Sequence, residues 1–188
     1  MPTRLEESLE RDIERIRQQV LEMSALAERA LRDCVEALTE GNRQRAYAVI
    51  LRDQYIDEKE KEIDRLCLEF LLRQQPVGMH LRLAYSTIKI NLELERVGDY
   101  AESVARQLLR LSRLPPPVPI RERIVEMANL AIPMLHDAID AFVRQDPTLA
   151  KGVILVEPAV DALLGKLNTD LLEALQEKVV QPEMLEPL

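Results

Sequence analysis

The 188-residue chain has no tryptophan, only 3% aromatic residues, five glycines and two cysteines. It also lacks any apolar run near the roughly 20 residues that a membrane-spanning helix requires, so we expect no transmembrane segment. The first residues hold no continuous hydrophobic stretch that could serve as a signal peptide, which favours a cytoplasmic protein. In that compartment Cys34 and Cys67 are expected to stay reduced and to pack as small hydrophobic residues.

The chain also lacks an excess of positive charge. It has 33 acidic and 25 basic side chains and a net charge of −8. Proteins that bind nucleic acids neutralise phosphates with clustered lysine and arginine. No basic patch interleaved with aromatic residues is present here, so we expect no nucleic-acid partner. An acidic chain is better suited to binding cations.

With few glycines and apolar residues spaced three and four apart, the chain is expected to be all-α. Gly41 suits the left-handed position at a helix end, Asn42 and Asp146 suit helix starts, and Pro76 breaks a helix. Four prolines in 112–119 predict a linker that is not helical. We expect Pro158 to kink the last helix. The helices predicted in this way cover about 4–40, 43–75, 78–111, 120–145 and 148–178.

The sequence contains an internal duplication. Shifting it by 104 residues aligns Ile16–Leu71 with Ile120–Leu175 without a gap and with 17 identities in 56 positions. This pattern predicts tandem three-helix-bundle repeats: a first repeat at 1–112, a Pro-rich linker at 113–119, and a partial second repeat at 120–188 that lacks its third helix. Apolar faces of the last two helices would then need cover from the first bundle or from a second copy, and we expect a homodimer.

Acidic side chains follow the faces of two predicted helices. Carboxylates of the second helix lie beside its apolar stripe, and those of the third share a stripe with large apolar residues that we expect to face the bundle. The chain has four acidic i, i+4 pairs that end in aspartate. The acids of the second helix are Asp53, Asp57, Glu60 and Asp64. The acids of the third helix are Glu95, Asp99 and Glu102, and the apolar residues that share their stripe are Leu81, Tyr85, Ile88 and Leu92. The last helix contains one further acidic pair, Glu157 and Asp161.

Carboxylates gathered between two helices repel one another and are costly to bury unless a positive charge lies among them. Two explanations remain open. Arg52, Lys59, Lys61 and Arg96 could pair with the acids along a solvated groove. Alternatively, the acids could hold a hard cation such as Mg²⁺, Mn²⁺, Ca²⁺ or iron, since oxygen ligands suit these ions and no histidine or cysteine lies nearby. The Glu-x-x-His motif of ferritin-like di-iron proteins is absent.

The stretch Asn91–Ala105 contains Glu-Arg-Val-Gly-Asp and resembles the ERIGD signature of the PhoU family, regulators of bacterial phosphate uptake. The duplicated three-helix bundle resembles this family too. The resemblance implies that Glu/Asp-x-x-x-Asp motifs on adjacent helices hold metal ions or clusters. The implied motifs are Asp53 with Asp57, Glu95 with Asp99, and, in the second repeat, Glu157 with Asp161.

The second repeat departs from this pattern, because Leu164 and Asn168 stand where the first repeat has Glu60 and Asp64. We expect repeat one to bind metal and repeat two to bind it poorly, or only with help from another chain. The resemblance implies a non-enzymatic negative regulator of phosphate-starvation signalling that contacts a sensor histidine kinase and the ATPase of a phosphate ABC transporter. The alternatives are a metal-free helical adaptor with a salt-bridged acidic groove, or a metal-dependent hydrolase, for which no base or nucleophile can be identified.

Overall fold

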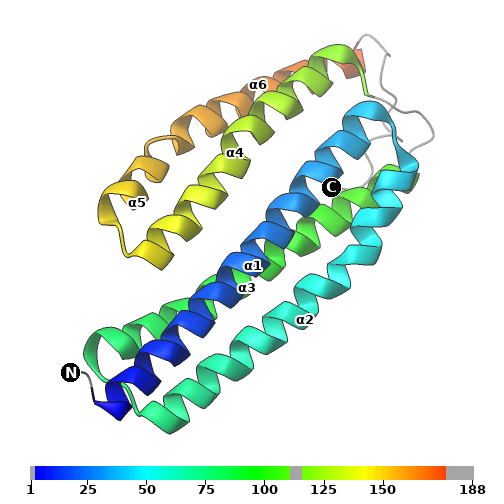
Figure 1. The fold of residues 1–188 in the computed structure, drawn as a ribbon. Coiled ribbons are helices and arrows are strands. Elements are labelled where there is room, and N and C mark those ends of the chain that lie inside the picture. The colour runs from blue at the N-terminus through cyan, green and yellow to red at the C-terminus, as the bar shows by residue number, and fades with distance from the viewer. Residues whose placement is uncertain (1–2, 111–115, 177–188) are drawn as a thin grey trace.

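The computed structural model describes residues 3–110 and 116–176, which form helices joined by short turns (Figure 1). None of the helices in this part of the chain is long and apolar enough to cross a membrane. The expected all-α fold is confirmed. The helices are α1 (Arg4–Glu40), α2 (Arg43–Gln74), α3 (Gly78–Arg110), α4 (Val118–Arg144), α5 (Pro147–Ile154) and α6 (Glu157–Gln176).

The end of α1 and the start of α2 follow the predicted caps. Gly41 ends α1 in the left-handed conformation with φ of 68°, which a residue without Cβ adopts at little cost. Asn42 then caps α2, because its Oδ1 accepts a hydrogen bond of 3.0 Å from the Arg45 amide. Gln75, with φ of 45°, ends α2 just before Pro76. Helices α1 and α2 therefore end within a residue of their predicted limits.

Helices α1, α2 and α3 pack lengthwise into a bundle (Figure 1). The stripe predicted on α2 is buried, with Ile56, Ile63 and Phe70 each at most 2% exposed. Cys34 and Cys67 are free thiols inside the bundle, and burial raises their pKa to about 11 and about 12. Such thiols are protonated at neutral pH, so the two cysteines act as core residues, as expected.

The expected orientation of α3 is wrong. Leu81, Tyr85 and Leu92 are 46%, 57% and 52% exposed, and Ile88 is half-buried. The buried face is instead rich in small and polar residues, because close contact with α1 and α2 leaves little room for large side chains. The acids of α3 consequently flank the core and do not interrupt it. The buried residues of α3 are Leu83, Ala84, Thr87, Asn91, Leu94, Gly98, Ala101, Ala105 and Leu108.

Helix α4 lies against α1 on the outside of the three-helix bundle (Figure 1). Ile139 of α4 is 6% exposed and belongs to the same apolar core as residues of α1, α2 and α3. His136 Nδ1 lies 3.1 Å from Oε1 of the buried Glu28 on α1. The first bundle thus covers the inner face of α4, which is one of the two kinds of cover considered from the sequence.

Two sequence-based boundaries are wrong in this half. Val118 and Pro119, placed in the linker, form the first turn of α4, where a proline needs no amide partner. Residues 111–115 lie outside the described part of the chain. The single helix predicted over 148–178 is divided into α5 and α6 by a turn at Leu155 and Val156. Residues 177 and 178 also lie outside the described part.

Pro158 explains the division of the predicted helix. It has no amide hydrogen to donate to the carbonyl of Ile154, so the helical ladder loses a hydrogen bond at this point. The amides before it turn back to nearer carbonyls, from Leu155 to Gly152 at 3.2 Å and from Val156 to Val153 at 3.0 Å. The expected kink is therefore a complete break, and Pro158 occupies the first turn of α6.

Candidate metal centre

Three carboxylates converge between α2 and α3. Asp53, Asp57 and Asp99 each offer an oxygen atom, and these atoms lie within 4.8 Å of one another. Asp53 and Asp57 are one turn apart on α2, so both point toward α3, and Asp99 on α3 points back at them. Asp53 and Asp57 are half-buried, whereas Asp99 is exposed. This is a rim site at the edge of the bundle core, open to ions from solvent.

Two residues of α3 hold the helices together at this site. Gly98 packs directly on α2, and a Cβ atom built there would lie 2.7 Å from Ile56 Cδ1 and 3.2 Å from Asp53 Oδ1. Asn91 is 1% exposed, and its Nδ2 donates to the Glu60 carbonyl and to Asp64 Oδ1, both at 2.9 Å. Gly98 thus permits the close approach of α2, and Asn91 fixes its register.

The carboxylates disturb one another's ionisation. Burial, and then the charges of Asp57, Glu102 and Asp99, raise the pKa of Asp53 to about 6. Burial also raises the pKa of Glu95, with further contributions from Asp99, Glu60 and Asp57. Each shift disfavours a negative charge at the site, and Arg106, which lowers the pKa of Asp53, offsets the effect of burial and of the neighbouring carboxylates only in part.

Three of the four cations that the salt-bridged alternative names pair with other acids. Arg52 pairs with Asp33 at 2.8 Å, on the side of α2 that faces α1. Lys59 pairs with Glu22 and Glu62, and Arg96 pairs with Glu93. Among the site acids, Glu102 has an arginine partner, Arg106. These contacts do not follow the pairing that the salt-bridged alternative predicts for Arg52, Lys59 and Arg96.

The structure places the remaining predicted ligands in three ways. The charge of Glu102 contributes to the raised pKa of Asp53, and the charges of Asp99, Glu60 and Asp57 contribute to the raised pKa of Glu95. Asp64 instead accepts the hydrogen bond from Asn91. Glu157 and Asp161 are exposed on α6, and no third carboxylate, histidine or cysteine in residues 3–110 and 116–176 joins them in a cluster.

Gly98 and Asn91 were not assigned a role from the sequence, although both lie in the signature stretch. A signal for each exists. Glycine in the middle of a long helix costs about 1 kcal/mol relative to alanine and therefore indicates close packing. An asparagine among apolar residues on the buried face of a helix indicates a hydrogen bond to a neighbouring backbone.

The residues of the site fit a hard cation. Carboxylate oxygens are the ligands that Mg²⁺, Mn²⁺, Ca²⁺ and iron accept, and a bound cation would remove the repulsion that raises the pKa of Asp53. Asp53, Asp57 and Asp99 would hold such an ion, and Glu95 or Glu102 could complete its coordination. The ion would join α2 to α3 beside Gly98, which packs directly on α2.

Comparison with known proteins gives a consistent result. The family model described as the PhoU domain matches residues 20–108 and 124–187. A "Phosphate-specific transport system accessory protein PhoU homolog" of Clostridium acetobutylicum is 32% identical over 169 residues, which are 89% of this chain and 77% of the relative. A homologue with the same description from Aquifex aeolicus is 34% identical over 162 residues, covering 86% of this chain and 73% of the relative.

Solved structures agree with these relatives. The crystal structure of PhoU from Pseudomonas aeruginosa superposes with a TM-score of 0.82 at 30% identity, covering 89% of this chain and 80% of that one. A phosphate transport system regulatory protein from Streptococcus pneumoniae shares the fold, with a TM-score of 0.80 at 21% identity. The chain therefore belongs to the PhoU family.

Proposed function

We propose that this chain is an accessory regulator of phosphate-specific transport that binds a metal ion between α2 and α3. Its ligands are Asp53, Asp57 and Asp99, with Glu95 and Glu102 beside them. The ion is Mg²⁺, Mn²⁺, Ca²⁺ or iron, all of which take oxygen ligands. Family membership supports the regulatory part, because the relatives are described as accessory proteins of this transport system.

The observation that carries the metal proposal is the convergence of three carboxylates without an arginine or lysine paired among them. Asp53, Asp57 and Asp99 lie within 4.8 Å, while Arg52, Lys59 and Arg96 pair with other acids. Like charges at this distance repel, so an arrangement of this kind is stabilised when a cation occupies it. The metal-free adaptor offers no comparable source of stabilisation.

The second repeat is proposed to bind metal poorly. Glu157 and Asp161 lie on α6, after the break that Pro158 imposes, and both are exposed. Leu164 and Asn168 replace the second pair of acids present in the first repeat. Two exposed carboxylates on one helix give an ion too few ligands.

In its regulatory role the protein acts by contact and not by catalysis. We propose that, in the cytoplasm, it represses phosphate-starvation signalling by contacting a sensor histidine kinase and the ATPase of a phosphate ABC transporter. Long, rigid helices with large exposed apolar residues, such as Tyr85 and Leu92 on α3, provide contact surfaces for these proteins.

A homodimer is the proposed form in solution. The α5–α6 segment leaves Ile154, Leu155, Leu164 and Leu172 between 45% and 80% exposed. A second copy that packs against this surface would remove these side chains from water. Size-exclusion chromatography with light scattering should give a dimer for the wild-type chain and a monomer for Leu172→Glu. A stable wild-type monomer would contradict the dimer.

Elemental analysis and a cellular reporter test the main proposal together. Protein purified without chelators should contain metal, and Asp53→Asn combined with Asp57→Asn should remove it. In cells that lack the wild-type gene, this double variant should fail to repress a phosphate-starvation promoter, whereas Asp161→Asn should repress it as the wild type does. A metal-free preparation that also takes up no Mn²⁺, Mg²⁺ or iron would instead support the adaptor.

A further inference from the structure

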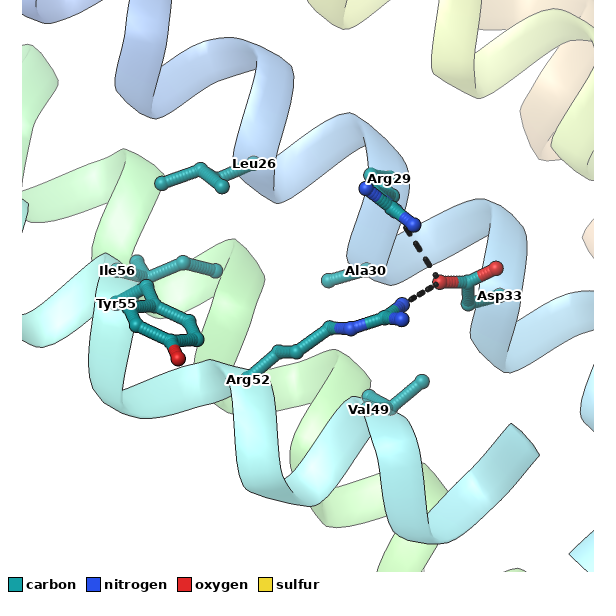
Figure 2. Close-up of a pocket in the computed structure, with 8 residues that line it drawn as sticks. All are labelled: Leu26, Arg29, Ala30, Asp33, Val49, Arg52, Tyr55 and Ile56. Atoms are coloured by element: carbon teal, nitrogen blue, oxygen red, sulfur yellow. Dashed lines mark hydrogen bonds and ion pairs between the residues drawn. The ribbon is translucent and has the colours of Figure 1, made fainter. Parts of the chain in front are cut away.

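A second concave feature lies on the face of α2 that packs against α1. Between α1 and α2 is a cavity of about 160 Å³ whose floor is apolar (Figure 2). Leu26 and Ala30 of α1 and Val49 and Ile56 of α2 form this floor, and Tyr55 borders it. An apolar protein cavity of about 150 Å³ holds one benzene ring. The α1–α2 cavity is therefore the size of one phenylalanine or leucine side chain.

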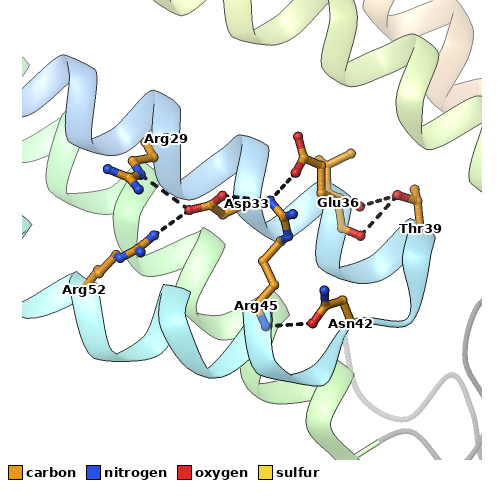
Figure 3. Close-up of polar contacts among 8 residues, drawn as sticks. Arg29, Asp33, Glu36, Thr39, Asn42, Arg45 and Arg52 are labelled. Carbon is orange, nitrogen blue, oxygen red and sulfur yellow. Dashed lines mark hydrogen bonds and ion pairs between the residues drawn. The ribbon is translucent and has the colours of Figure 1, made fainter.

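The rim of this cavity is positively charged. Asp33 on α1 is shared by three guanidinium groups: Arg52 Nη1 and Arg29 Nε lie 2.8 and 3.7 Å from its Oδ2, and Arg45 Nη1 lies 3.3 Å from its Oδ1 (Figure 3). Arg45 also pairs with Glu36. Three positive charges thus face two negative ones, in a chain whose net charge is −8.

The arginines at this rim remain accessible to a partner. The side chains of Arg29 and Arg52 are 64% and 46% exposed, and the contact of Arg29 with Asp33 is long. A guanidinium group has five N–H donors, so each arginine can bind a further carboxylate and still keep its contact with Asp33. Positive potential at the mouth of an apolar cavity favours a ligand that combines an apolar group with negative charge.

An apolar stripe leads along α2 to the cavity. Tyr47, Leu51 and Tyr55 follow one another at four-residue spacing and are 55%, 70% and 50% exposed. Exposed tyrosine and leucine in a continuous row are typical of protein-binding surfaces, where aromatic side chains and arginine are enriched. A free anion would contact the arginines but would leave this stripe and the cavity floor exposed to water.

We propose that the α1–α2 groove, defined by the cavity and the Tyr47–Leu51–Tyr55 stripe, is a docking site for an acidic segment of a partner protein. The partner inserts one phenylalanine or leucine side chain into the cavity and places an adjacent aspartate or glutamate against Arg29 and Arg52. A buried apolar anchor surrounded by polar contacts is the usual arrangement of an interface hot spot. The identity of the partner rests on the proposed function, because the proteins to test are those of phosphate signalling.

Binding measurements with purified proteins test this site. The partners are the ATPase of the phosphate transporter and the sensor kinase from the same genome, each titrated against the full chain by biolayer interferometry. Arg29→Glu and Arg52→Glu reverse the charge of the rim, and Ala30→Leu fills the cavity without changing charge. Arg65→Glu is the matched control, because Arg65 is an exposed arginine of α2 that pairs with Glu69 away from the groove.

Each of the three groove variants should weaken binding by about ten-fold or more, whereas Arg65→Glu should change it by less than about two-fold. Circular dichroism should show that all four variants keep their helical content. Changing the partner's aspartate or glutamate to lysine should restore binding to Arg52→Glu, which loss of folding could not explain.

Two negative results have different meanings. If the wild-type chain binds one partner and the three groove variants bind it as Arg65→Glu does, the proposed function stands and the groove is not the docking site. If the wild-type chain binds neither protein, the proposed regulatory contact fails, and the docking site fails with it.

Discussion

The raised pKa of Asp53 shows that a negative charge at the metal centre is unfavourable in the absence of an ion. Burial and the neighbouring carboxylates raise its pKa to about 6, above the value of about 4 in an unfolded chain. Between these two values the folded state binds more protons than the unfolded state. The stability that the protonated Asp53 side chain contributes to the folded state is therefore fully present below about pH 4, and it is lost as pH rises through 6.

The metal-free protein is consequently expected to lose about 1 kcal/mol of stability from this group between pH 4 and pH 7, after allowance for screening by solvent. Urea unfolding in the presence of a chelator measures this difference. Asp53→Asn should be more stable than the wild type at pH 7 and should lack this part of the pH dependence. Identical pH profiles for the two proteins would show that Asp53 is not destabilised by its neighbours.

Gly98 lies where α3 packs directly on α2. Replacing it with alanine places a methyl group 2.7 Å from Ile56 Cδ1 and 3.2 Å from Asp53 Oδ1, so these two side chains of α2 must shift. We expect Gly98→Ala to lower stability by about 1 to 3 kcal/mol and to weaken Mn²⁺ binding.

Gly165→Ala is the control for this substitution. Gly165 lies within α6 and has no neighbour within 4 Å of an added Cβ, so alanine should stabilise the chain by about 0.4 to 1 kcal/mol. Thermal unfolding and metal titration of both variants give the comparison. Unchanged metal affinity in Gly98→Ala would mean that the close helix contact does not shape the site.

The sequence identified the acids that meet but not what brings them together. The spacing of Asp53 and Asp57 places both on one face of α2, and that part of the prediction follows from helix geometry alone. Which face of α3 turns inward could not be read from hydrophobicity. Small and polar residues such as Gly98 and Asn91 are buried there, while Leu92 is exposed.

At the scale of helices, the two repeats end their first helix differently. Gly41 ends α1 at φ of 68°, and its counterpart 104 residues later, Gln145, ends α4 at φ of 56°. A residue with a Cβ atom pays about 1 kcal/mol or more in this conformation, whereas glycine does not.

Gln145→Gly should therefore stabilise the protein by about 0.5 to 1 kcal/mol, and Gly41→Ala should destabilise it by about 1 kcal/mol. Chemical denaturation measures both changes. Equal effects of the two substitutions in the same direction would contradict this account of the helix ends.

The ends of helices could be predicted where a residue type favours a single local structure. Asn42 and Asp146 both cap helices as predicted, with side-chain oxygens that accept amide hydrogen bonds. Pro158 was ambiguous, since a proline inside an apolar periodic segment can kink one helix or begin another. Only packing decides between these outcomes, and here α5 and α6 both rest on α4.

At the scale of the whole molecule, α4 joins the second half to the first bundle. Ile139 is 6% exposed and lies in the core shared with α1, α2 and α3. Because this core is continuous, we expect the two halves to unfold in one transition. Ile139→Ala should lower the free energy of unfolding by about 2 to 5 kcal/mol.

The exposed Leu164 serves as the control for Ile139, since Leu164→Ala should change stability by less than about 0.5 kcal/mol. Differential scanning calorimetry should show a single peak that moves to lower temperature in Ile139→Ala. Two separate peaks, with one unaffected by the substitution, would show that the halves fold independently.

Calorimetric titration with Mn²⁺ tests whether Asp53, Asp57 and Asp99 bind a metal ion. Asp99 contributes to the three-carboxylate cluster, whereas Asp161 lies exposed on α6. Asp99→Asn should therefore weaken binding by more than about ten-fold, since loss of even an outer contact to a metal ligand costs that much. Asp161→Asn should bind as the wild type does. Equal loss in the two variants, or no binding by the wild type, would contradict the assignment of the metal centre to α2 and α3.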